Sequence, residues 1–183
     1  DLIVPGGFFW DAAFGNSRGS LTWWENAGNG QQWIRHDIIT GSLSVYHSVV
    51  YDDFDGDAVA DIMTVSEAAG LPSSITDDVI ELQILRGNGD GTFQPPVKVA
   101  DGGGSLIEAW DVNGDGHLDV VSAQYFGPVL GQPFVPLAAR NASNASFVWF
   151  ENDGQGNFTR HAIGVNQGPS FNIVPVRNLL GDG

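Results

Sequence analysis

Residues 82–99 read LQILRGNGDGTFQPPVKV, an apolar run followed by a Gly-x-Gly turn and a second apolar run. Glycine accepts the positive backbone angles of a tight turn, so this pattern predicts a β-hairpin. Related stretches occur at residues 21–38 and 147–163, with their glycine pairs in register. The spacing of roughly 60 residues is typical of a repeated supersecondary unit.

An acidic stretch lies between successive hairpins. The segment DDFDGDAVADIMTV at 52–65 matches WDVNGDGHLDVVSA at 110–123, and strand-like apolar runs flank both. The opening residues 1–7 match the end of this motif, and residues 178–183 match its first six positions. Each unit therefore contains four strands, in the order strand, acidic loop, strand, variable loop, strand, Gly-x-Gly hairpin, strand.

These repeats predict an all-β fold of four-stranded antiparallel β-propeller blades, about three blades of a larger propeller or array. Four strands in roughly 60 residues fit a blade better than a sandwich, because a sandwich does not need near-identical units. Residues 1–183 are expected to form one partial propeller domain whose ends contact neighbouring blades or subunits. The predicted divisions are a partial blade at 1–41, blades at 42–102 and 103–166, and the start of a further blade at 167–183.

Composition narrows the range of partners. The chain has 22 Asp and Glu residues against 7 Lys and Arg residues, which gives a formal net charge of -15. Nucleic acid is not an expected partner, because phosphate contacts need a basic face. No apolar run approaches the roughly 20 residues of a membrane span. The chain has no cysteine, which excludes disulfides and thiolate metal sites.

The acidic loops at 53–61 and 111–119 place side-chain oxygens at positions 1, 3, 5 and 9. Such oxygens converge on one point, and a site without His or Cys ligands suits Ca²⁺, with Mg²⁺ second because it requires stricter octahedral geometry. One Asp-Gly stretch alone is typical of an ordinary turn, but two copies matched at four positions favour a metal. The predicted ligands are Asp53, Asp55, Asp57 and Asp61 with the Val59 carbonyl, and Asp111, Asn113, Asp115 and Asp119 with the His117 carbonyl.

The loops DFDGDAVAD and DVNGDGHLD, with the hairpins LRGNGDGTF and WFENDGQGNF, resemble FG-GAP/VCBS repeats. These are the calcium-binding blades of integrin α-subunit-type propellers and of some secreted lectins. The resemblance covers nearly the whole chain outside the two variable loops, 68–78 and 126–146, and it implies Ca²⁺ at the positions named above. Ala58 replaces the usual glycine at position 6, which predicts strain in the first loop. Leu180 occupies position 3 of the terminal copy, so weaker binding is expected at Asp1, Asn178 and Asp182.

Three sequons favour a secreted glycoprotein: Asn141 and Asn144 in the variable loop 126–146, which is expected to be exposed, and Asn157 on a hairpin. The expected function is extracellular adhesion, recognition of a glycan or protein, or assembly. The alternative is part of a secreted carbohydrate-active enzyme of the lyase or dehydratase type. An enzyme is less favoured, because the chain contains no G-x-S-x-G, phosphate-loop or H-E-x-x-H motif.

Aromatic residues divide into two groups by repeat position. Trp23 and Trp149 recur at the same position, which favours packing between blades over sugar stacking. Residues 8–10 (FFW) fall outside the repeat register and are better candidates for a ligand site. His47 has no counterpart in the repeats and is a candidate for lining a channel. Two histidines at equivalent strand positions are expected to be structural: His36 and His161.

Overall fold

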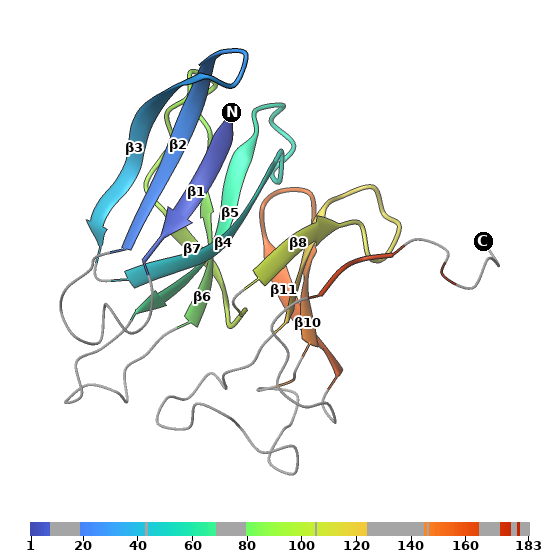
Figure 1. Ribbon diagram of the computed structural model, residues 1–183. Coiled ribbons are helices and arrows are strands. Elements are labelled where there is room, and N and C mark those ends of the chain that lie inside the picture. The colour runs from blue at the N-terminus through green and yellow to red at the C-terminus, as the bar shows by residue number, and fades with distance from the viewer. Residues whose placement is uncertain are drawn as a thin grey trace, which may run out of the picture.

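The computed structural model contains 11 strands and no helix among the residues that it describes, so the all-β prediction is confirmed. The strands form three antiparallel sheets, none of which closes on itself (Figure 1). The described residues are 1–7, 19–42, 44–68, 80–104, 106–123, 145, 147–164, 173–176 and 179.

The second and third sheets share one topology, with four strands in chain order, and the first sheet has three strands. The first sheet consists of β1 (Leu2–Gly6), β2 (Gly19–Gly28) and β3 (Gln32–Ser42). The second consists of β4 (Ser44–Asp52), β5 (Asp61–Ala68), β6 (Ile80–Leu85) and β7 (Val97–Asp101). The third consists of β8 (Leu106–Trp110), β9 (Asp119–Ala123), β10 (Phe147–Asn152) and β11 (Phe158–Gly164).

The Gly-x-Gly turns join β2 to β3, β6 to β7 and β10 to β11, as the repeats predict. Gly89 and Gly154 have φ angles of 79° and 75°, a region that strongly favours glycine. The acidic loops 53–61 and 111–119 join β4 to β5 and β8 to β9. The counterpart of β5 and β9 in the first sheet is β1, so a strand equivalent to β4 and β8 is missing from the described part of that sheet.

The second sheet has apolar residues on both of its faces. In β5, Ile62 packs with Leu21 of β2, whereas the next residue, Met63, joins a cluster with Val148 and Phe150 of β10. All five side chains are fully buried. Side chains alternate between the faces of a strand, so a continuous apolar run fits a sheet that is covered on both sides.

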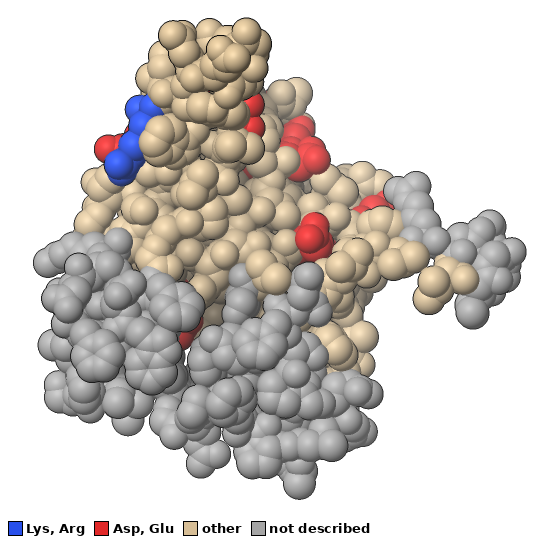
Figure 2. Space-filling model, in the orientation of Figure 1, with Lys and Arg blue, Asp and Glu red and all other residues tan. Residues whose placement is uncertain are grey.

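The described surface contains few positive charges. On the face shown in Figure 2, acidic side chains lie at several separate places, whereas basic side chains gather at one. Within the described ranges, no helix has the length and hydropathy needed to cross a membrane. The variable loop 126–146 lies outside the described residues except at Ala145, which is fully buried, so the expected exposure is wrong at that residue.

Candidate metal centre

The loop 53–61 is folded by its own carboxylates. Asp53 accepts hydrogen bonds from the N–H groups of Gly56 (2.8 Å) and Ala58 (2.9 Å), one at each carboxylate oxygen. Asp57 Oδ1 accepts a bond from the N–H of Val59 (2.8 Å). Aspartates commonly bond to backbone groups a few residues further on, and here these contacts bend the loop tightly.

Asp61, the first residue of β5, anchors the end of this loop and is only 1% exposed. Its carboxylate accepts bonds from the N–H of Phe54 (3.3 Å) in the same loop and of Gly87 (3.0 Å) after β6. Burial raises the pKa of Asp61, and repulsion from Asp55 and Asp57 adds to that rise. An ionised carboxylate there is therefore destabilised unless a cation lies close to it.

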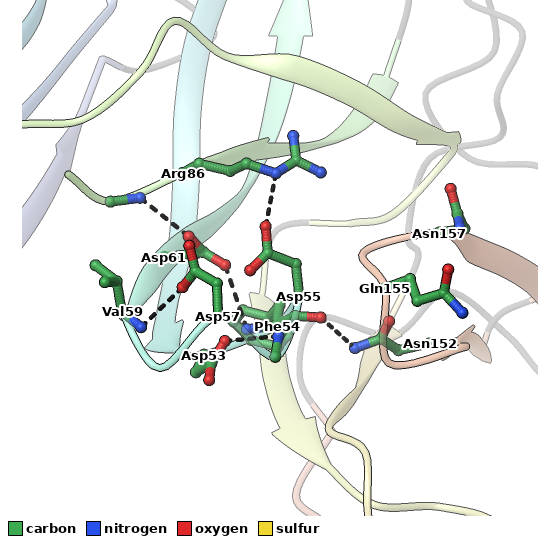
Figure 3. Close-up of polar contacts among 12 residues, drawn as sticks. Asp53, Phe54, Asp55, Asp57, Val59, Asp61, Arg86, Asn152, Gln155 and Asn157 are labelled. Atoms are coloured by element: carbon green, nitrogen blue, oxygen red, sulfur yellow. Dashed lines mark hydrogen bonds and ion pairs between the residues drawn. The ribbon is translucent and has the colours of Figure 1, made fainter. Parts of the chain in front are cut away.

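Asp55 completes a cluster of three carboxylates (Figure 3). Its Oδ2 accepts a bond from Arg86 Nε at 2.8 Å, whereas its Oδ1 is buried and has no hydrogen-bond partner among the described residues. One oxygen from each of Asp53, Asp55 and Asp61 lies within 4.8 Å of the other two. Oxygens that share a Ca²⁺ at about 2.3–2.6 Å lie at most about 5 Å apart, so this arrangement fits the ion. Across the described ranges, no other three His, Cys, Asp or Glu side chains come this close.

The remaining predicted ligands of the first loop are placed differently. Asp57 is not part of the close cluster, and the role of the Val59 carbonyl stays a prediction. Ala58 has a φ of 68°, which confirms the predicted strain, since this region costs a residue with a Cβ about 1–2 kcal/mol. Gly116 holds the same position in the second loop with a φ of 91° and avoids that cost.

The second loop, 111–119, has the same scaffold. Asp111 Oδ1 accepts a bond from the N–H of Gly114 at 2.7 Å, as Asp53 does in the first loop. Asp119 is fully buried and accepts bonds from the N–H groups of Val112 (2.8 Å) and Asn152 (2.8 Å). Burial raises its pKa, as it does for Asp61. The two loops therefore use their ninth residue in the same way.

The centres of the two loops differ. Asn113 donates from Nδ2 to Asp115 Oδ2 (2.9 Å) and to Glu151 Oε1 (3.1 Å). The pKa of Asp115 is lowered, first by the N–H of His117 and then by Asn113. The carboxylates of this loop do not reach the close spacing of the first cluster. The His117 ring lies directly against Gly154, so a side chain at that position would require the ring to move.

The first sheet carries a third copy of the ninth-position contact. Asp1 Oδ1 accepts a bond from the N–H of Asn26 at 2.7 Å, matching the Asp61–Gly87 and Asp119–Asn152 contacts. Seven other predicted site residues lie outside the described part of the chain: Phe8, Phe9, Trp10, Asn141, Asn144, Asn178 and Asp182.

The third sequon asparagine lies on the β10–β11 hairpin. Asn157 is exposed, and its Nδ2 donates to Asp153 Oδ2 at 2.8 Å. A glycan on Asn157 would compete with this contact, which also lowers the pKa of Asp153. Its glycosylation stays a prediction.

Two residues that sequence reasoning missed connect the first loop to its surroundings. Arg86 binds Asp55, and Asn152 donates from Nδ2 to the Phe54 carbonyl (2.8 Å) and the Leu118 carbonyl (3.1 Å), so it links both acidic loops (Figure 3). A signal for Arg86 was present in the repeats. The residues at the same position in the other two hairpins are Glu25 and Glu151. Of the three hairpins, only the one beside the loop that carries Asp55 therefore has a positive charge at this position.

Histidines pair with glutamates in all three sheets. His36 bonds to Glu25 and stacks on Trp23 at 3.9 Å between ring centroids. His47 bonds to Glu67 at 2.7 Å, and its side chain is only 14% exposed. In the third sheet the same arrangement is formed by Trp149, His161 and Glu151.

Comparisons with known proteins do not assign a family. No protein-family model matches the chain, and neither the curated proteins nor the solved structures yield a match. The resemblance to FG-GAP/VCBS repeats therefore stays a prediction that rests on the sequence motifs.

Proposed function

We propose that the chain is a calcium-stabilised segment of a secreted β-propeller that acts in adhesion, recognition or assembly outside the cell. The observation that carries this proposal is the cluster of Asp53, Asp55 and Asp61, with the buried, unpartnered Asp55 Oδ1 within it. All of its ligand atoms are oxygens, which favours Ca²⁺ over softer metals. The propeller is supported by repeated sheets that pack face to face and by their matching acidic loops.

Calcium would act as a structural ion. The first loop gathers three carboxylates in a chain of net charge -15, and Arg86 neutralises only one of them. A bound divalent cation offsets the remaining repulsion and stabilises the fold in proportion to its binding free energy. Since the chain has no disulfides, such ions would supply the cross-links that hold the loops between the strands.

Calorimetric titration of the chelator-treated chain tests this proposal. We expect binding of Ca²⁺, with Mg²⁺ weaker, and an affinity lower by on the order of tenfold or more in Asp55→Asn, which removes a ligand charge. Asp90→Asn is the matched control, because Asp90 lies on a hairpin and bonds only to Thr92 in the described contacts. Absence of calcium binding, or an equal loss in both variants, would contradict the proposed site.

Recognition is tested separately from metal binding. We infer that the partner is a glycan or an extracellular protein, since the acidic surface disfavours polyanions. A glycan array probed with and without calcium should give calcium-dependent signals if the partner is a sugar. If no glycan on the array binds and the chain captures a defined extracellular protein, the partner is a protein.

A further inference from the structure

A groove of about 350 Å³ lies at the junction of the second and third sheets, both of which have four strands. Residues 97–99 of β7 line one side and residues 156–158 of the β10–β11 hairpin line the other, together with Arg86, which directly follows β6. Three residues of a strand span about 10 Å. The groove is therefore large enough for one ring-sized group and too short for an extended segment.

Basic side chains gather along this junction. The described part of the chain contains four Lys and Arg residues, and three of them lie here: Arg86, Lys98 and Arg160. Arg86 and Lys98 line the groove. Arg160 follows Phe158 by two positions on β11 and interacts electrostatically with Asp101 of β7. In a chain of net charge -15, this local concentration favours a ligand with a negative charge.

The positive charges are specific to this junction. Lys98 has the same place in its strand pair as Asp37 has in the pair of β2 and β3. Arg86 likewise has the position of Glu25. Glu25 and Asp37 lie together at the junction of the first and second sheets. Both charges are thus reversed between two equivalent junctions, a difference that the common sheet scaffold does not require.

The ammonium group of Lys98 is held only by surface contacts. Its Nζ lies 2.5 Å from Asp101 Oδ1 and 3.4 Å from Glu81 Oε1, and its side chain is 43% exposed. Exposed ion pairs of this kind contribute little to stability. Lys98 can therefore turn toward a bound anion at small cost.

The guanidinium of Arg86 is oriented by the first acidic loop. Among the described contacts it bonds only through Nε, which donates to Asp55 Oδ2, and its two terminal nitrogens point away from that loop (Figure 3). Nη2 lies against Gly156, 3.0 Å from the position that a Cβ would occupy. Two guanidinium nitrogens side by side match the two oxygens of a carboxylate.

We propose that this groove binds the carboxylate of an acidic sugar, a uronic acid unit of an extracellular glycan, through Arg86 and Lys98. This rests on the proposed function and specifies its glycan partner. Apolar side chains at Val97, Val99 and Phe158 also line the groove, so the apolar face of a sugar ring has a surface to lie on. The side chain of an acidic peptide has no such face. A single carboxylate, unlike a polyanion, avoids the acidic surface elsewhere.

Asp55 connects this groove to the candidate metal centre. One of its oxygens bonds to Arg86, whereas the other is buried and has no hydrogen-bond partner among the described residues. A calcium ion in the cluster adds two positive charges close to Arg86, which Asp55 otherwise neutralises. The carboxylate of the sugar should therefore bind more tightly in calcium, and by linkage the sugar should raise the affinity for calcium by the same factor.

Calorimetric titration with sodium glucuronate at constant ionic strength tests the groove, on chain produced in bacteria so that Asn157 carries no glycan. In calcium, glucuronate should bind about tenfold or more tighter than glucose, which has no carboxylate. Arg86→Gln should weaken the binding of glucuronate by on the order of tenfold or more, and Lys98→Gln should also weaken it. Lys98 is exposed, so its variant should fold normally even if Arg86→Gln disturbs the acidic loop. The control is Arg35→Gln, at a half-exposed cation on β3, which should bind as the wild type does.

Equal binding of glucose and glucuronate, or equal binding by the Lys98→Gln and Arg35→Gln variants, would overturn the site. Tighter binding of N-acetylglutamate amide than of glucuronate would assign the groove to a peptide and overturn the sugar. Chelator should weaken glucuronate binding by about fivefold or more, and an unchanged affinity would refute the connection through Asp55.

Calcium titration of the same samples separates this proposal from the proposed function. A chain that binds calcium but not glucuronate refutes only the sugar site. A chain that binds no calcium refutes the proposed function, whatever its affinity for glucuronate.

Discussion

Replacing Asn152 with alanine should destabilise the chain more than its position near a hairpin turn suggests. The side chain is 1% exposed and makes three hydrogen bonds, to the Phe54 and Leu118 carbonyls and from the N–H of Gly154. A typical bond contributes about 0.5–1.5 kcal/mol net, so the loss is about 3 kcal/mol. It should exceed this value if the Phe54 carbonyl stays buried without a partner.

Asn26 provides a matched control, because it holds the same position in the first hairpin. It is exposed, and within the described ranges its side chain accepts bonds only from Gly28 and Gly30 of its own turn. Water replaces such bonds readily, so Asn26→Ala should cost at most about 1 kcal/mol. Urea unfolding in calcium, followed by tryptophan fluorescence, gives both free energies of unfolding. Equal losses for the two variants would refute the role of Asn152 as a link between the acidic loops.

Two further predictions concern titratable groups. His47→Ala should lower the free energy of unfolding by about 3–5 kcal/mol, because it leaves the buried Glu67 carboxylate unpaired. His36→Ala removes one partner of a pair that is about 40% exposed, so it should cost at most about 1 kcal/mol. Similar losses for the two variants in urea unfolding would contradict this difference. Burial raises the folded-state pKa of Asp61 above 3.8, so without calcium its contribution to stability is present below pH 3.8 and is lost as the pH rises through the raised pKa. Melting curves recorded across pH in chelator should show that the melting temperature of Asp61→Asn declines less with rising pH than that of the wild type. An equal decline in both would argue against this role of Asp61.

The repeats predicted the local structure well, because local structure depends on residues close in sequence. Glycines at 89 and 154 fix hairpins, and the apolar runs beside them supply strands, whatever the neighbouring sheet does. The strain at Ala58 was predictable for the same reason, since this position of the acidic loop has a positive φ in both copies.

The contacts between sheets could not be read from the repeats. Asn152 reaches the Phe54 carbonyl across 98 positions of sequence, and the equivalent hairpin residue of the second sheet is Gly87, which has no side chain. The spacing of the acidic positions is equal in the two loops, yet only the first gathers three carboxylates closely. That difference follows from the asparagine at 113 and from Glu151 beside it, where the first loop has Asp55 and Arg86.

The connections between strands are of two kinds, and the two kinds lie at opposite ends of the sheets, one strand length apart. The acidic loops and Gly-x-Gly hairpins lie at one end of the sheets, whereas the connections from β1 to β2, β5 to β6 and β9 to β10 leave from the other end. For the eight residues of β5 this distance is about 25 Å. Insertions at the second end should therefore accumulate during evolution without disturbing the carboxylates. Repeats can then differ in the exposed connections at that end while keeping the same acidic loops and hairpins at the other.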